Sequence, residues 1–341
     1  MSQLKVDNIT NEAGTGATDF PNGASVAGNN LPTGGPLAGF RNAIINGNFD
    51  HWQRGTSGTA GYVSDRWATI RGGSTVAISR QAFALGQTDV PNEPEYFHRS
   101  VVSSVAGAGN FANLAQRVEG VRTFAGQTVT VSFYAKADAA KNMALELFQT
   151  FGTGGSPSSE VNAIGVTTLA LTTTFQKFTV TADIPSIAGK TVGTNGNDDV
   201  GINFWFDAGS NFDARTNSLG HQSGTFDIAQ VQLEAGSVAT PFERRPVGTE
   251  LALCQRYYSR PPGFIGVIYN SVTNSEWATN LAFPVEMRAT PTMSRLSASV
   301  TPGSSNPVAD SVTISNCRVV FTAGNVGANQ AAFQFEADSE L

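Results

Sequence analysis

The sequence predicts an all-β protein built mainly from an antiparallel β-sandwich. Three observations lead to this prediction. Charged residues make up only 14% of the 341-residue chain, below the roughly 25% of an average soluble domain, which argues against long salt-bridged helices. Glycine is abundant, with 36 residues, and suits short strands joined by many turns. Several segments alternate apolar and polar side chains with the period of two that indicates a half-buried strand.

Residues 1–40 are expected to form an extended arm rather than a domain. They hold few large apolar side chains, and residues 29–36 (NNLPTGGP) have the composition of a linker. Such a segment cannot bury enough apolar surface to fold alone. The opening MSQLKVDNITNE has no apolar stretch, so we expect no secretory signal. A partner protein is therefore expected to order this arm.

Residues 41–248 carry the strand pattern that predicts the sandwich. In residues 128–137 (TVTVSFYAKA), Val129, Val131 and Phe133 share one face, and polar side chains occupy most of the other. Residues 200–208 (VGINFWFDA) show the same alternation, with one apolar and one mixed face. Further strands are expected at 143–151, 176–184 and 226–234. Trp52 and Trp67 are expected to pin the start of the domain into its core, and Asp65 and Arg66 to form a structural pair.

A short connecting helix is predicted at residues 249–259 (TELALCQRYYS). Thr249 can cap it, and Leu251, Cys254 and Tyr258 recur at helical spacing before Pro261 and Pro262 end it. Such a short stripe needs a partner surface, either around a three-fold axis or against a sandwich, because isolated helices of this length are marginal.

Residues 260–341 are predicted to form a small C-terminal β-domain. Short strands are expected at 264–269, 277–283, 311–314, 319–322 and 332–335. Cys254 and Cys317 have no metal-ligand spacing, and we expect two reduced thiols in a protein made in a cytoplasm.

Charge and motifs argue against several functions. The net charge of −6 speaks against a nucleic-acid partner, and no apolar run of about 20 residues predicts a membrane span. The three histidines are isolated, and no nucleophile motif is present, so we expect no enzyme. A glycosidase needs two carboxylates across a cleft. Whether Glu146, Glu160 and Glu234 pair across strands cannot be decided from the sequence.

Six stretches, taken in order, resemble the tail-fibre family of tailed bacteriophages. The first, residues 4–23 (LKVDNITNEAGTGATDFPNG), resembles the short N-terminal motif of many phage fibres. The others are similar to the start, middle and end of the family's jelly-roll domain and to its connecting helix: 41–55 with 64–67 (RNAIINGNFDHWQRG, SDRW), 116–136 (QRVEGVRTFAGQTVTVSFYAK), 184–192 (IPSIAGKTV), 228–245 (IAQVQLEAGSVATPFERR) and 250–258 (ELALCQRYY). Residues 260–341 match less.

The resemblance implies a structural tail-fibre protein of a phage virion, assembled in the host cytoplasm. It implies a homotrimer, attachment of residues 1–40 to another tail or baseplate protein, and a carbohydrate-binding-like jelly roll that contacts host-surface glycan or receptor. The C-terminal domain would be the receptor-binding tip, with Trp277 and Tyr269 as candidate glycan contacts. The alternatives are an adaptor that links the tail to a separate receptor-binding protein, and a glycan depolymerase.

In the jelly roll, the candidate glycan contacts are Trp205, which lies between Asn203 and Asp207, and Tyr134. A pyranose ring binds flat aromatic faces beside amide or carboxylate groups. Both rings lie on the mixed faces of their strands, so they would form one platform if the strands shared a sheet. The alternative is that both rings cover a subunit or domain interface.

The resemblance also implies a structural calcium in jelly-roll carbohydrate modules. Gly47 and Asp50 match the N-terminal stretch that supplies one ligand. The acidic partner pair expected in the last strand is replaced by Ala229 and Gln230, and Asp227 is displaced by two residues. Calcium needs about six to eight oxygen ligands, so Asp50 and Asp227 are weak calcium candidates.

Overall fold

The structure is a computed structural model of the chain. It describes residues 24–26, 29–31, 40–261, 263–272 and 274–341, without the side chains of 24–26, 29–31 and 264–271. In the arm, β1 (Ala24–Val26) pairs with β2 (Asn29–Leu31) in an antiparallel register. The rest of the predicted arm, except Phe40, lies outside the described residues.

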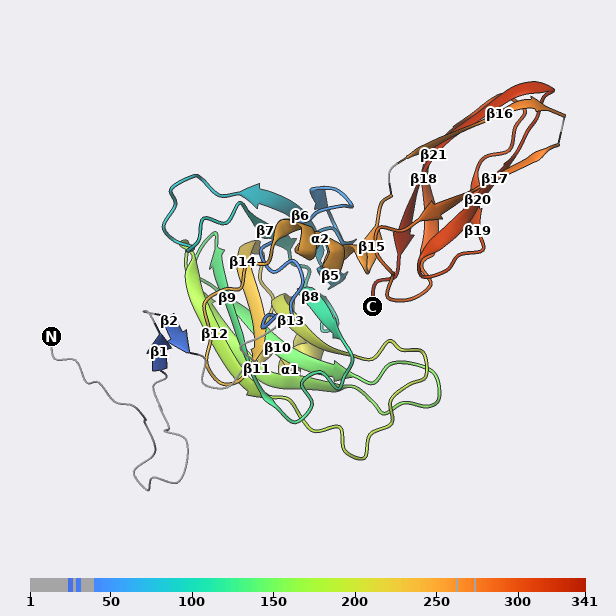
Figure 1. The fold of residues 1–341 in the computed structure, drawn as a ribbon. Coiled ribbons are helices and arrows are strands. Elements are labelled where there is room, and N and C mark those ends of the chain that lie inside the picture. The colour runs from blue at the N-terminus through green and yellow to red at the C-terminus, as the bar shows by residue number, and fades with distance from the viewer. Residues whose placement is uncertain (1–23, 27–28, 32–39, 262, 273) are drawn as a thin grey trace.

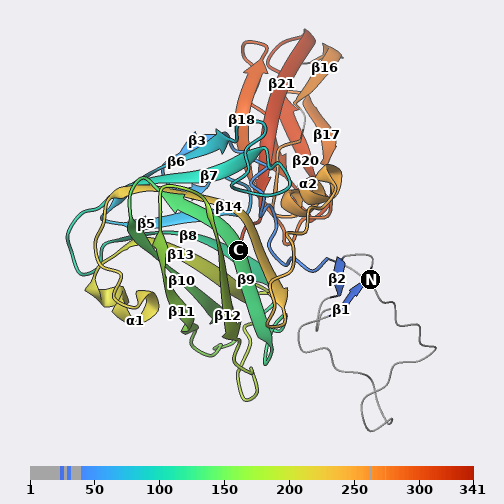
Figure 2. The same cartoon turned by 90° about the vertical axis from the view of Figure 1, so that its left-hand side faces the viewer.

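Two six-stranded antiparallel sheets form a sandwich, which confirms the predicted fold class (Figures 1 and 2). Sheet I has the order β11-β10-β13-β8-β5-β4 and consists of β4 (Gly61–Tyr62), β5 (Ala68–Gly72), β8 (Phe111–Glu119), β10 (Lys141–Thr150), β11 (Val161–Leu171) and β13 (Asp199–Ala208). Sheet II has the order β12-β9-β14-β7-β6-β3 and consists of β3 (Ser57–Gly58), β6 (Thr75–Ala82), β7 (Tyr96–Ser103), β9 (Thr128–Ala137), β12 (Gln176–Asp183) and β14 (Gly224–Ala235).

The core lies between the two sheets and is rich in aromatic rings. Phe133 of sheet II meets Phe204 of sheet I edge-on, with 4.8 Å between ring centroids. Phe206 of sheet I stacks on Phe226 of sheet II at 4.9 Å. Trp67 is fully buried against the same cluster, as the sequence predicted. These contacts explain why the alternating strands were recognisable, because their apolar faces all point into one core.

The expected strands of the sandwich appear within two residues of their predicted bounds. The predicted pair of Asp65 and Arg66 is wrong. The Asp65 carboxylate accepts hydrogen bonds from the backbone N–H and side-chain amide of Gln53, whereas Arg66 pairs with Glu340. Neighbouring residues in a chain seldom face each other, and here Arg66 also has a left-handed φ of 70° that turns its side chain away.

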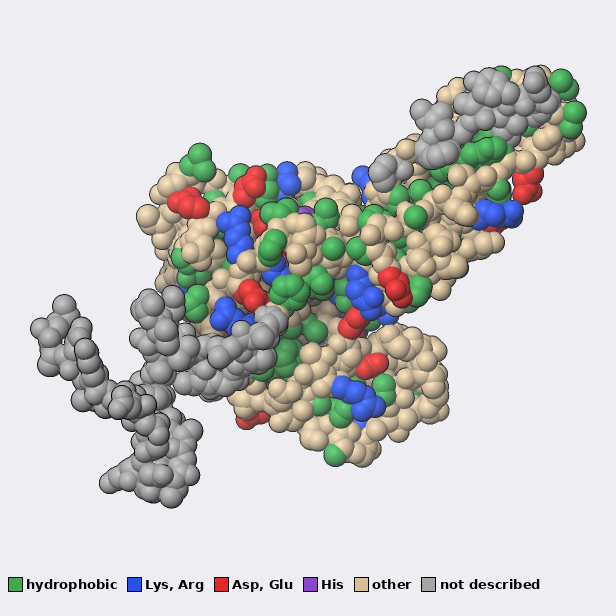
Figure 3. All heavy atoms as spheres, in the orientation of Figure 1, with side chains coloured by type: hydrophobic (Ala, Val, Ile, Leu, Met, Phe, Trp, Pro, Cys, Tyr) green, Lys and Arg blue, Asp and Glu red, His purple; other side chains and the backbone are tan. Residues whose placement is uncertain are grey.

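A second β unit follows the sandwich and extends away from it (Figure 3). One sheet joins β15 (Tyr258–Ser259), β21 (Gly327–Asp338) and β16 (Phe264–Ser271), with β18 (Thr292–Val300) also paired to β21. The other has the order β17-β20-β19, from β17 (Glu276–Ala282), β20 (Asn316–Thr322) and β19 (Val308–Asp310). The strand expected at 311–314 is absent from this described segment, and β18 was not predicted. β18 was missed because its mostly exposed small residues show no clear alternation.

The connecting helix begins and ends earlier than predicted. It is α2 (Val247–Gln255), with Pro246 at its N-cap instead of Thr249. Tyr258 leaves the helix because it pairs with Asp338 of β21. Cys254 and Tyr258 are each 1% exposed within the single chain, whereas Leu251 is partly exposed, so the chain itself covers two of the three residues of the expected stripe. Cys254 and Cys317 are both free and buried. Among the described residues, no helix is long and apolar enough to cross a membrane.

The end of the chain is locked against the sandwich by buried charges. The Arg66 guanidinium is 1% exposed, pairs with Glu340 and lies 3.3 Å from the ring centroid of Tyr257. Arg54 pairs with Asp338 at 2.9 Å and with Glu340 at 3.3 Å. The last residues of the chain therefore supply the counter-charge for a cation that the sandwich buries.

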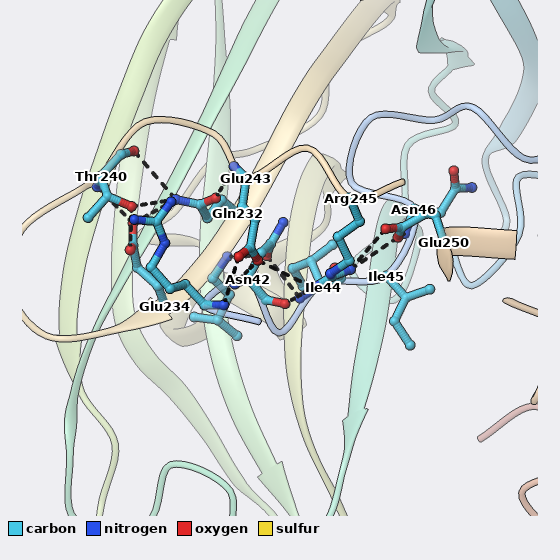
Figure 4. A network of polar contacts seen from close by, with 12 residues as sticks. Asn42, Ile44, Ile45, Asn46, Gln232, Glu234, Thr240, Glu243, Arg245 and Glu250 are labelled. Carbon is cyan, nitrogen blue, oxygen red and sulfur yellow. Dashed lines mark hydrogen bonds and ion pairs between the residues drawn. The ribbon is translucent and has the colours of Figure 1, made fainter. Parts of the chain in front are cut away.

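A second buried cation, Arg245, joins the start and end of the sandwich (Figure 4). Its Nη2 donates to the carbonyl of Asn42, and its Nη1 donates to the carbonyl of Ile44 at 3.1 Å. Nη1 also lies 3.1 Å from the Glu250 carboxylate of α2. The Glu243 carboxylate accepts the backbone N–H of Asn42 at 2.9 Å. One guanidinium thus connects the first residues of the sandwich, the segment after β14 and α2.

Glu340→Ala is expected to lower the free energy of unfolding by about 3–5 kcal/mol, since Arg66 would stay buried without its counter-charge. Urea denaturation followed by circular dichroism measures this loss. Asp338→Ala is the control, because the Asp338 side chain is 43% exposed and such pairs contribute about 1 kcal/mol or less. If both variants lost the same free energy of unfolding, the buried pair would contribute no more to stability than the exposed one.

His98 gives the fold a pH dependence. It is fully buried, lies 2.9 Å from the Ser100 hydroxyl through Nε2 and stacks on Trp52 at 5.9 Å. Burial lowers its pKa from 6.5 to about 3. Below pH 6.5 the histidine of the unfolded chain therefore binds a proton, whereas His98 of the folded protein stays neutral. The free energy of unfolding therefore decreases as the pH falls from 6.5 towards 3. Burial raises the pKa of Asp199 from 3.8 to about 6. Asp199 therefore acts in the opposite direction, because its contribution to stability increases as the pH falls from about 6 towards 3.8.

The effect of His98 is isolated by comparison with His98→Gln, which removes the titration and keeps Asp199. Between pH 7.5 and pH 5 the wild-type protein should lose about 2 kcal/mol more stability than the variant. The reason is that pH 5 lies about 1.5 units below the pKa of histidine in the unfolded chain, and each unit corresponds to about 1.4 kcal/mol. Urea denaturation at both pH values gives the two differences. Identical pH dependence in both proteins would rule out His98 as the source.

Candidate functional site

The two aromatic rings predicted to form one platform lie on opposite faces of the sandwich. Trp205 belongs to β13 of sheet I, and Tyr134 belongs to β9 of sheet II. Both side chains point away from the core, because the alternate residues Phe204 and Phe133 point into it. The single platform is therefore wrong, since it required both strands in one sheet.

Trp205 is covered rather than open. Its side chain is 1% exposed, and Phe111 and Phe212 pack on it with ring centroids 5.7 and 5.1 Å away. The Arg215 guanidinium lies 5.1 Å from the ring centroid. Phe111 belongs to β8, and the rest of the cover comes from η1 (Ser210–Phe212) and α1 (Asp213–Thr216), which follow β13 in the chain. A sugar therefore has no free face of Trp205 to stack on, and the ring forms part of a floor.

Glu146 of β10 organises this floor. It is fully buried, and its Oε1 accepts from the indole Nε1 of Trp205 and from Nδ2 of Asn203, both at 3.0 Å. Arg215 pairs with the same carboxylate at 2.5 Å, and the backbone N–H of Ala163 donates to Oε2 at 3.0 Å. Because Nδ2 of Asn203 is held by Glu146, the amide oxygen of Asn203 is free for another partner.

A groove of about 160 Å³ runs over this part of sheet I. Its lining combines aromatic, amide and cationic side chains: Ile70, Phe111, Asn113, Ala115, Arg117, Phe148, Glu160, Asn162, Asn203, Trp205, Phe212 and Arg215. We call it the sheet I groove. The Oδ1 atoms of Asn113, Asn162 and Asn203 have no hydrogen-bond partner. Since a buried unpaired acceptor costs about 1–3 kcal/mol, a ligand hydroxyl that reaches these oxygens would remove that cost.

Two arginines supply donors at the rim of the sheet I groove. Arg117 pairs with Asp199 at 2.6 Å and lies 5.4 Å from the ring centroid of Phe148, with 30% of its side chain exposed. Arg215 pairs with Glu146, and 28% of its side chain is exposed. A planar guanidinium carries five N–H donors, so each arginine keeps donors for a ligand oxygen. Donors, acceptors and apolar rings together make a surface suited to a polyhydroxyl ligand.

Asp207 does not belong to the groove. It is fully buried, and it accepts from the hydroxyls of Ser74 and Ser104 at 2.6 and 2.7 Å. His221 Nδ1 lies 2.9 Å from the same carboxylate, which raises the pKa of the histidine. The pairing of β13 with β8 shifts register between Trp205 and Asp207, so the regular two-residue spacing is broken there. Asp207 holds loops together instead of flanking Trp205.

The C-terminal candidates cannot be placed together. Trp277 lies on β17, is partly buried and packs against Phe321 with ring centroids 5.2 Å apart. Tyr269 lies on β16, and its side chain is outside the described part of the structure.

The calcium candidates do not fit a calcium site. Asp227 pairs with Arg99 at 2.7 Å and with Lys136 at 3.7 Å, so cations already surround its carboxylate. Asp50 accepts from the Asn48 amide, and burial raises its pKa. No group of three or more metal-ligating side chains occurs among the described residues. Gly47 is needed for another reason: a Cβ there would lie 2.1 Å from the carbonyl oxygen of Val231.

Sequence reasoning missed most of the groove. Asn113 and Phe148 lie outside the recognised motifs, and the motif at 116–136 that contains Arg117 marked no binding role. Their shared face depends on the pairing of β8, β13 and β10. The one available signal was alternation, because Asn113 and Arg117 fall on the polar side of the segment FANLAQRVE. Of the three glutamates considered for pairing, Glu146 and Glu160 lie at or under the groove, whereas Glu234 binds Thr240 on sheet II.

Comparisons with known proteins identify no family. No family model matches the chain, and no curated protein matches it. Among solved structures, the enzymatically active domain of tailspike protein 4 from bacteriophage CBA120 is 15% identical, with a TM-score of 0.35, over 57% of this chain and 22% of that chain. The family 11 carbohydrate-binding module of Clostridium thermocellum, in complex with a β-1,3-1,4-mixed-linked tetrasaccharide, is 10% identical, with a TM-score of 0.32, over 52% and 91%.

The module TmCBM61, in complex with β-1,4-galactotriose, is 12% identical, with a TM-score of 0.30, over 58% of this chain and 100% of that one. The match to the tailspike covers only about a fifth of the tailspike chain. Similarity at this level carries no information about what the present chain binds.

Proposed function

We propose that this chain is a structural tail-fibre subunit of a phage virion and that its sandwich binds host-surface glycan in the sheet I groove. The observation that carries the binding role is the set of unpartnered amide oxygens of Asn113, Asn162 and Asn203 beside Arg117 and aromatic rings. The fibre role rests on the ordered motifs that resemble tail-fibre proteins. The fibre is proposed to be a homotrimer assembled in the host cytoplasm.

Binding without hydrolysis is the proposed activity. A glycosidase needs two carboxylates across the scissile bond. Glu160 is the carboxylate among the described groove-lining residues. Glu146 beneath it is fully buried and ion-paired with Arg215, so it is poorly placed to donate or accept a proton. The groove has a volume of about 160 Å³, below the roughly 300–1,000 Å³ of ligand pockets. Each site is therefore expected to bind sugar near millimolar Kd, about 4 kcal/mol. Several linked sites would raise the effective affinity by roughly 10²–10⁴.

Asn113→Ala is expected to weaken glycan binding by about 2–13-fold, the effect of one lost hydrogen bond. Phage that carry the variant fibre should adsorb to host cells more slowly, and purified protein should give weaker signals on a host-glycan array. Asn142→Ala is the matched control, because Asn142 is an exposed residue of β10 that does not line the groove. Unchanged adsorption and array binding in Asn113→Ala, with normal virion assembly, would refute the groove as the binding site.

Deletion of residues 1–40 is expected to leave a soluble trimer of residues 41–341 that no longer joins the virion. The reason is that the described core cluster of the sandwich begins at Ile44, and that Phe40, whose ring lies 4.8 Å from the Arg245 guanidinium, is itself 56% exposed. Light scattering measures the oligomer, and immunoblotting of purified particles measures incorporation. Normal incorporation would show that attachment lies elsewhere in the chain, and a monomer at micromolar concentration would contradict the trimer.

A further inference from the structure

The outer face of sheet II carries a larger groove than sheet I does. Its volume is about 420 Å³. Its floor spans neighbouring strands β12, β9 and β14 (Figure 2). The lining residues are Pro91, Asn92, Ser132, Phe133, Tyr134, Lys177, Gln230, Ala239, Pro241 and Phe242. We call it the sheet II groove. It is separated from the sheet I groove by the whole core of the sandwich.

The floor is built around Tyr134 and Lys177, which are direct cross-strand partners. The Tyr134 ring is partly buried against the cluster of Val90, Phe97 and Phe175, and this burial raises the pKa of its hydroxyl. Its position is therefore fixed by packing on one side while it lines the groove on the other. A ring held in this way can stack on the apolar face of a pyranose with little loss of side-chain entropy.

Gln230 is the observation that indicates a ligand. It sits at the irregularity where β14 shifts register against β9, with a left-handed φ of 48°. It is 3% exposed, and its Nε2 donates to the carbonyl of Pro91 at 2.8 Å. Its Oε1 has no partner, although Gln230 lines the groove. Both the left-handed backbone and the buried, unpaired acceptor cost free energy. A ligand hydroxyl that donates to Oε1 would remove the cost of the unpaired acceptor.

The charge of this face favours an anion. Lys177 is exposed and makes no ion pair among the described residues. Elsewhere on the outer face of sheet II, the Asp227 carboxylate pairs with both Arg99 and Lys136, so these three side chains together carry one net positive charge. The loop between β6 and β7, which supplies Pro91 and Asn92 to the groove, carries Asp89, Glu93 and Glu95, none of which lines the groove. A carboxylate on the sugar would meet the Lys177 ammonium without having to displace another anion.

We propose that the sheet II groove is a second carbohydrate site, specific for a pyranose that bears a carboxylate. Tyr134 stacks on the ring, Gln230 Oε1 accepts a ring hydroxyl, and Lys177 pairs with the carboxylate. The proposal takes its ligand class from the proposed glycan-binding role, but its residues are independent of the sheet I groove.

The test compares methyl β-glucuronide with methyl β-glucoside, which differ only at the carboxylate. Saturation-transfer difference NMR on the full-length protein gives both Kd values and tolerates a large oligomer. The glucuronide should bind with a millimolar Kd, at least threefold more tightly than the glucoside, and Lys177→Gln should remove this preference, on the scale of an exposed charge pair. Lys190→Gln is the matched control, since Lys190 is exposed and outside the groove.

Two further variants separate this site from the sheet I groove. Tyr134→Ala should weaken the glucuronide about 2–13-fold through the lost stacking, with its melting temperature checked for folding. Asn113→Ala should leave glucuronide binding unchanged although it weakens binding in the sheet I groove. Absence of saturable glucuronide binding, or equal Kd values for Lys177→Gln and Lys190→Gln, would overturn the proposal. Loss of glucuronide binding in Asn113→Ala alone would place the acidic sugar in the sheet I groove and overturn it as well.

Discussion

The sandwich depends on one buried guanidinium, that of Arg245. Its donors satisfy the backbone carbonyls of Asn42 and Ile44, which lie at the beginning of the domain and outside any sheet. A buried carbonyl without a donor is costly, and a buried cation without an anion is more so. Glu250 of α2 supplies the anion. The same contact that closes the sandwich therefore orients α2 and, through it, the chain that enters the C-terminal unit.

The same physical solution recurs at three places in the molecule. Arg245 with Glu250, Arg66 with Glu340 and Arg215 with Glu146 each join an arginine outside the strands to a carboxylate on a different segment of the chain. The carboxylate side chains are largely or fully buried, with exposed fractions of 13% for Glu250, 5% for Glu340 and 0% for Glu146. A chain poor in charge thus places its few charges where segments meet. Each pair fixes a boundary: the start of the domain, the end of the chain, and the floor of the sheet I groove.

The sequence predicted the parts of the fold that depend on local alternation. The segment 128–137 is β9 residue for residue, because its inward side chains all reach one core. It could not predict what depends on contacts distant in sequence. Arg66 meets Glu340 across 274 residues, and no local pattern marks that pair. Trp205 was correctly placed on the outer face, but its cover by Phe212 and Arg215 depends on how the segment after β13 folds back.

The two outer faces obtain their amide acceptors in different ways. In sheet I, Asn113 lies opposite Trp205, on the polar side of the regular alternation of β8. In sheet II, Gln230 is the residue at the slip of β14 against β9. A bulge turns one side chain out of the regular alternation and leaves it beside, rather than within, the hydrogen-bonded ladder. An amide placed there packs against strands that cannot pair with it, so its oxygen stays available at a rigid position. The sheets therefore hold these acceptors in fixed positions, and no long loop has to become ordered when a ligand binds. A low entropy cost of this kind is what a weak binding site that is repeated many times requires.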